Sequence, residues 1–183
     1  MIYDSYEWKK ELSKQSRKLR FISHLYWSDT ILKLIGHKAD MIILTVAIIA
    51  RKLFESGKLS DDADNYKICV KEYTPRRHID RLHSWVEDGD YSWGEYLEKS
   101  IPAKYICNSI IHSYAYSLCF TEKRKLYSIF VVSDQFRNEL LYEVTIADLT
   151  KYLEFIATDS VCEVSMKFDT KKGDYKTDLK RRS

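Results

Sequence analysis

Apolar residues in the first third of the chain recur at helical spacing. The segment from Tyr6 to about Phe21 is rich in Lys, Glu, Leu and Arg, which favour helix. Its apolar positions repeat at three, four or seven residues, so one stripe of this helix can face a core. Ser28 and Asp29 predict the start of a short helical continuation, which ends at Gly36.

A second helix is predicted from about Lys38 to Ser56. The run Met41–Ala50 at its centre is β-branched, but an aspartate precedes it, Arg-Lys follows it and Gly57 comes next. These are signals of helix ends rather than strand ends. Because the run is apolar on all sides, it predicts a buried central helix.

The middle of the chain is more polar. Residues 67–73 alternate in the manner of a short strand that stops at Thr74-Pro75, and residues 76–85 favour one or two helical turns. Residues 87–90 predict a turn. Ser100 and Pro102 are typical of the first turn of a helix, which would carry Asn108 and His112.

In the last third the apolar period changes from helix to strand. Alternation predicts strands at 114–120, 126–132, 140–146 and 161–168, with an amphipathic helix at 147–157. The charged tail after Lys171 is expected to fray. The sequence therefore predicts an α+β protein. A helical bundle spans 1–113, and a small antiparallel β-sheet with one helix and a charged tail follows at 114–183, the two forming one compact unit.

Composition narrows the class of protein. Apolar residues make up 45% and charged residues 31% of 183 residues, as in an ordinary soluble domain. The most apolar run is about half the roughly 20 residues that a membrane span requires. The start of the chain lacks a signal-peptide pattern, and the four cysteines (69, 107, 119 and 162) form no CxxC pair. We therefore expect a cytoplasmic protein with free thiols, no membrane association, no metal and no cofactor.

The formal net charge of +3 is too small to indicate nucleic-acid binding by itself. The positive residues are nevertheless clustered, and either solvated surface or one shared basic face would explain them. The clusters taken as candidate nucleic-acid contacts are Arg76, Arg77 and Arg81, and Lys123, Arg124 and Lys125.

Asn108 and His112 are the candidate chemistry of the chain. Four residues apart on a helix, they place an amide and an imidazole on one face. Imidazole is the side chain best suited to proton transfer near neutral pH. In RNA cleavage without metal, a base takes the proton of a ribose 2′-hydroxyl, an acid protonates the leaving oxygen, and a cation stabilises the phosphorane.

This part of the chain resembles the HEPN superfamily (higher eukaryotes and prokaryotes nucleotide-binding domains), whose helical bundles include many metal-independent ribonucleases. Their motif is Arg, a polar residue that is often Asn, three variable residues, then His. Asn108 and His112 match it, and the motif's Arg falls on Cys107. The resemblance covers roughly residues 5–115. It implies a homodimer, with His112 as base or acid and Asn108 as orienting residue. In place of the motif's Arg, either Lys104, one turn earlier, or Arg51, at the end of the predicted buried helix, would supply the cation.

Two alternatives stay open. The segment 77–83, Arg-His-Ile-Asp-Arg-Leu-His, is a rival site because it holds an intact Arg, two His and an acid. Alternatively, Asn108 and His112 are a buried structural pair in a non-enzymatic protein-interaction or structural module. The leading hypothesis is an RNA-directed protein, either a metal-independent endoribonuclease or a catalytically decayed RNA binder.

Overall fold

A five-stranded antiparallel sheet lies at the centre of the computed structural model, which describes residues 4–83, 85–171 and 173–181. The strands run in the spatial order β2-β1-β5-β4-β3. Their bounds are β1 Lys67–Pro75, β2 Tyr91–Pro102, β3 Ser113–Phe120, β4 Leu126–Ser133 and β5 Leu141–Thr145. A separate hairpin consists of β6 Val161–Asp169 and β7 Asp174–Arg181.

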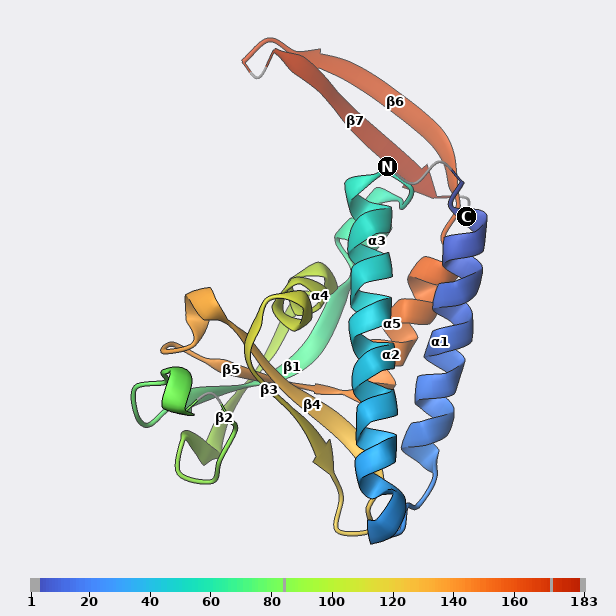
Figure 1. Ribbon diagram of the computed structural model, residues 1–183. Coiled ribbons are helices and arrows are strands. Elements are labelled where there is room, and N and C mark those ends of the chain that lie inside the picture. Colours follow the sequence, from blue (N-terminus) through green and yellow to red (C-terminus); the bar gives the residue numbers. More distant parts are fainter. Residues whose placement is uncertain (1–3, 84, 172, 182–183) are drawn as a thin grey trace.

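The helices gather on one side of this sheet (Figure 1). The long ones are α1 Tyr6–His24, α2 Asp29–Glu55 and α5 Ile146–Thr158, and the short ones are α3 Asp61–Asp64 and α4 Ala103–Ile111. Single 3₁₀ turns, η1 and η2, occupy Arg81–His83 and Asp134–Phe136. The main core joins α1, α2, α4 and α5 to the helix-facing residues of β1, β4 and β5. A smaller cluster on the opposite face packs Ile79, from the loop between β1 and β2, on Tyr73, Tyr91 and Leu141.

The mixed α+β class is confirmed, but the predicted order of a helical bundle followed by a sheet is wrong. Residues 67–102 supply β1 and β2, so the sheet draws strands from both sides of residue 113. β1 matches its prediction, whereas β2 was not predicted: residues 91–99 were assigned to no element, and Ser100 and Pro102 were expected to begin a helix. The reason is physical: β2 is an edge strand exposed from Gly94 to Ser100, and a strand without a buried face shows no apolar alternation.

Two helix predictions need correction. α2 runs unbroken through Gly36, which has an ordinary helical backbone there, so the predicted break is absent. One side of α2 is also open to solvent, with Met41 71%, Leu44 45% and Ile48 42% exposed, so its centre is not buried on all sides. The end of α2 is as expected, since Gly57 has φ +61° and the Lys58 amide donates to the Leu53 carbonyl.

The three strands predicted from 114 to 146 and the helix that follows them are confirmed as β3, β4, β5 and α5. The tail after Lys171 is not frayed, because 174–181 form β7 against β6. Among the described residues, no helix is long and apolar enough to cross a membrane.

Candidate functional site

The short helix α4 has two chemically different faces. Its buried face consists of Ala103, Ile106, Cys107 and Ile110, which are spaced three and four apart and pack into the main core. The opposite face presents Tyr105, Asn108, Ser109 and His112 to a groove. The helix ends at His112, whose amide donates to the Asn108 carbonyl at 2.9 Å.

This groove has a volume of about 850 Å³ and is open to solvent. The connection from β4 to β5 also lines it, with Ser133, Asp134, Gln135 and Phe136, as does Tyr142 of β5. Asn108 and His112 are both exposed, so the alternative of a buried Asn–His pair is wrong. The pair escapes burial because α4 meets the core only through the face that carries Cys107.

Arg51 of α2 reaches the imidazole at the edge of this groove. Its Nη1 lies 2.6 Å from His112 Nε2, although the two residues are 61 positions apart in the chain. Because a guanidinium has no acceptor and stays protonated, it must be the donor. Nε2 then accepts, so the ring in this contact is neutral and carries its proton on Nδ1.

Glu55, one turn after Arg51 on α2, orients the guanidinium. Its carboxylate accepts from Arg51 Nε at 2.7 Å and from Lys52 Nζ at 2.7 Å. These hydrogen bonds, that of Lys52 first, lower the pKa of the Glu55 carboxyl below its usual range. Glu55 thereby binds the Nε side of the guanidinium, while Nη1 faces His112.

The two alternative cations of the sequence analysis have different environments. Lys104 Nζ lies 2.7 and 2.9 Å from the two carboxylate oxygens of Asp64, which ties the start of α4 to α3. Arg51, not Lys104, therefore contacts His112. Cys107, at the position of the motif's Arg, is buried, and burial raises its pKa to about 12. An arginine there would lie in the core, so a cation has to reach the groove from another helix.

A second groove of about 630 Å³ adjoins the first at Asp134 and contains two arginines, Arg81 and Arg137. Arg137 pairs with Asp134, and its guanidinium carbon lies 4.6 Å from the centre of the Tyr114 ring. Sequence reasoning missed Arg137 because the loop reads as a turn stabilised by its own side chains. It also missed Tyr105, although the spacing from Tyr105 to Asn108 and His112 is that of one helical face.

The candidate basic clusters lie in separate places. Lys125 stacks 4.2 Å from the ring centre of Tyr26, at the N-terminal end of α2, where Figure 1 shows the turn between β3 and β4. Arg51 lies 22 residues after Asp29, the first residue of α2, which corresponds to about 33 Å along the helix axis. Residues 123–125 therefore do not border the groove, whereas Arg81 lines its neighbour.

Arg77, part of the rival site, is engaged within the fold. Its guanidinium pairs with Asp90, whose side chain is fully buried, and lies 3.5 Å from Glu87. These contacts close the loop between β1 and β2 over the smaller core cluster. His78 is exposed, and the side chain of His83 lies outside the described part of the structure.

Replacing Arg77 with alanine is expected to lower the free energy of unfolding by about 2 kcal/mol, because it leaves the Asp90 carboxylate buried without its counter-charge. The figure is below that for a fully buried pair, since the Arg77 side chain is 40% exposed. Arg76→Ala is the matched control, because the Arg76 side chain donates to the Ser92 hydroxyl at 3.3 Å, and losing this bond should cost at most about 0.5 kcal/mol. Urea denaturation of both variants measures the difference. Equal losses would show that the ion pair to Asp90 contributes little.

Comparisons of the chain with protein-family models, with curated proteins and with solved structures return no match.

Proposed function

We propose that the protein acts on RNA and cleaves it without a metal ion at the groove between α4 and the connection from β4 to β5. The observation that carries the proposal is the 2.6 Å contact between Arg51 and the exposed His112 at the edge of this groove. A neutral imidazole beside a cation is the pair of groups that cleavage of one phosphodiester requires, and this supports the proposal. The resemblance of Asn108 and His112 to the HEPN motif supports the same reaction.

In this reaction the ribose 2′-hydroxyl replaces the guanidinium at His112 Nε2, and the imidazole accepts its proton. O2′ then attacks the adjacent phosphorus, while Arg51 donates to the non-bridging oxygens on which charge develops. The bond from phosphorus to O5′ breaks, O5′ takes a proton from water, and His112 returns the proton it accepted to solvent. The products are a 2′,3′-cyclic phosphate and a 5′-hydroxyl. In this proposal Asn108, one turn before His112 and on the same groove, donates its amide to the same phosphate.

The walls of the two grooves suit a single strand of RNA. Tyr105 is 55% and Phe136 38% exposed, and exposed aromatic rings stack unpaired bases. Arg137 and Arg81 in the adjoining groove supply cations for neighbouring phosphates. The electrostatic part of this binding should weaken as salt rises.

The proposal also covers the setting of the reaction. A cytoplasmic location and a homodimer belong to it, the homodimer on the ground of the HEPN resemblance. None of the contacts that place His112 and Arg51 requires a second copy. If the groove binds RNA without cutting it, the protein is a decayed RNA binder. If it does neither, the interaction module is the better description.

The test is cleavage of labelled single-stranded and structured RNA by the wild-type protein in excess chelator. We expect chelator-resistant cleavage, products ending in 2′,3′-cyclic phosphate, and no cut where one nucleotide is replaced by its 2′-deoxy form. The 2′-deoxy substrate is the matched control, since it keeps the base and the phosphate but lacks the nucleophile. Cleavage of that substrate, or activity that the chelator removes, would contradict the mechanism.

A further inference from the structure

The hairpin of β6 and β7 extends away from the rest of the protein (Figure 1). Its register places apolar residues of both strands on one face and charged residues on the other. The apolar face consists of Val164, Met166, Phe168, Tyr175, Thr177 and Leu179. The charged face includes Glu163, Lys167, Asp169, Lys176, Asp178 and Lys180. Four of the apolar side chains, at 164, 166, 168 and 175, are at least half exposed.

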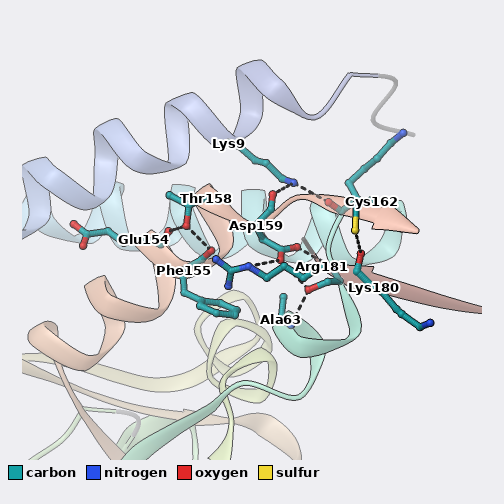
Figure 2. Close-up of polar contacts among 11 residues, drawn as sticks. Lys9, Ala63, Glu154, Phe155, Thr158, Asp159, Cys162, Lys180 and Arg181 are labelled. Carbon is teal, nitrogen blue, oxygen red and sulfur yellow. Dashed lines mark hydrogen bonds and ion pairs between the residues drawn. The ribbon is translucent and has the colours of Figure 1, made fainter. Parts of the chain in front are cut away.

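The base of this hairpin is attached to the fold. Arg181 lies 3.8 Å from Asp159 and stacks on Phe155, and the Leu179 amide donates to Asp61 of α3 at 3.0 Å. Figure 2 shows the contacts of Arg181 around the end of α5. Beyond this base the two strands have each other as ladder partners. A two-stranded hairpin alone is marginally stable in water, and it needs further strands or a packed face.

The outer edge of β6 is the free one. The Leu179 amide points away from β6 toward Asp61, so Leu179 and Val164 form a non-hydrogen-bonded pair. The amide and carbonyl of Val164, and of every second residue from it, therefore face the outer side of β6. In the described ranges, β6 is paired with β7 alone, and its residues from Cys162 to Phe168 are exposed. The equivalent edge of β7 is blocked at its base by α3.

We propose that this edge pairs with the β6 edge of a second copy of the chain, antiparallel and centred on Ser165. The two hairpins then form one four-stranded sheet with a single apolar face, in an isologous dimer. In this register Val164 lies opposite the partner's Met166, and Glu163 lies opposite the partner's Lys167. The proposal rests on the hairpin itself and does not depend on RNA cleavage.

The charged residues of β6 favour a second copy as the partner, and they favour one register of pairing. Within one hairpin Lys167 lies opposite Lys176, and like charges directly opposite are unfavourable. The second copy places Glu163, which pairs with Lys180 of its own hairpin at 2.9 Å, beside Lys167, twice per dimer. A shift of the centre to Met166 would set Glu163 against the partner's Asp169, and a shift to Val164 would leave Lys167 opposite a valine. Pairing centred on Ser165 is the register in which opposite charges meet.

The first test is a charge reversal, read by sedimentation equilibrium of the full chain. We expect a wild-type dimer that Glu163→Lys or Lys167→Glu weakens about tenfold or more, since each reverses two cross-strand pairs. The double variant E163K/K167E restores opposite charges and should return to within about threefold of wild type. Asp178→Lys, on the same face but on β7, the outer strand of the four-stranded sheet, is the matched control and should leave the dimer unchanged. A wild-type protein that stays monomeric, or a double variant no better than the single ones, overturns the proposal.

The second test locates the two-fold axis of the dimer and does not depend on charge. In a background with Cys69→Ser and Cys162→Ser, Ser165→Cys should form an interchain disulfide with oxidised glutathione, because paired Cβ atoms lie about 5 Å apart. Asp178→Cys is the control, because residue 178 lies directly opposite residue 165 within the hairpin. In the dimer the two copies of residue 178 are three strand spacings, or about 14 Å, apart, so this cysteine should stay reduced. Crosslinking at 178 without crosslinking at 165 overturns the proposed edge. Since RNA cleavage is measured separately, failure of the dimer leaves the proposed reaction unaffected, and the reverse also holds.

Discussion

Replacing His112 with alanine is expected to lower the rate of chelator-resistant RNA cleavage by about 10²–10⁴-fold, because the variant has no group to accept the 2′-hydroxyl proton. His112 is exposed and ends α4, so its loss should cost at most about 0.5 kcal/mol of stability. RNA affinity should change little, since the aromatic and arginine contacts of the two grooves remain. Initial rates, binding isotherms and melting temperatures of both proteins separate these effects.

Arg51 provides the second half of this prediction. Arg51→Ala should lower the cleavage rate by about 10²–10³-fold through lost stabilisation of the phosphorane. Lys52→Ala is the matched control, because Lys52 is the next residue on α2, binds the same carboxylate of Glu55 and does not contact His112. Its rate should equal that of wild type.

The double variant of His112 and Arg51 gives the sharpest outcome. If the two side chains act on one phosphate, it should be little slower than His112→Ala alone, since groups that act as a unit are not additive. A His112→Ala protein that cuts RNA at the wild-type rate, or that melts far below wild type, would remove His112 from the chemistry.

The site illustrates which contacts a sequence can reveal. The four-residue spacing of Asn108 and His112 placed both side chains on one face of α4, because that relation depends on local helical geometry alone. The contact between Arg51 and His112 depends on how α2 and α4 pack, so the sequence could offer Arg51 only beside Lys104 as an alternative. Arg137 enters through the folding of the connection from β4 to β5, which no spacing in the chain encodes.

The same distinction between local and tertiary causes applies to the elements of the fold. α5, which has one buried face, was predicted because burial imposes a period on its apolar residues. β4 and β5 are buried on both faces, and they were predicted as short, mostly apolar runs between polar loops. β2 is exposed along most of its length, and β7 alternates apolar residues with charges that resemble a solvated tail. Both strands form because a neighbouring strand supplies their hydrogen bonds, which is a tertiary cause.

Asp159→Ala is expected to cause the largest loss of stability, about 3 kcal/mol. The carboxylate of Asp159 is fully buried and accepts from the Ser60 amide at 2.7 Å and from the Ser60 hydroxyl at 2.8 Å. Alanine would leave both donors buried without an acceptor, just where α3 begins. It would also remove the counter-charge of Arg181 at the base of the hairpin (Figure 2).

Lys9 adds to this loss. Its ammonium donates to the carbonyls of Lys58 and Asp159, and burial lowers its pKa while the Asp159 charge opposes that shift. Without the carboxylate, a half-buried cation loses its nearest compensating charge. We therefore expect a melting temperature about 6–12 °C below wild type.

Two variants make the prediction specific. Asp159→Asn keeps one oxygen that can accept from Ser60 and should lose about half as much stability as alanine. Asp62→Ala removes an exposed carboxylate from the same first turn of α3 and should cost about 0.5 kcal/mol or less. Because Asp159 joins the end of α5, the start of α3 and the base of β7, its alanine variant should also be cut faster by protease within 161–181 than either control. If Asp159→Ala has the same melting temperature as Asp62→Ala, and protease cuts the hairpins of both variants at the same rate, these contacts do not hold the hairpin to the fold.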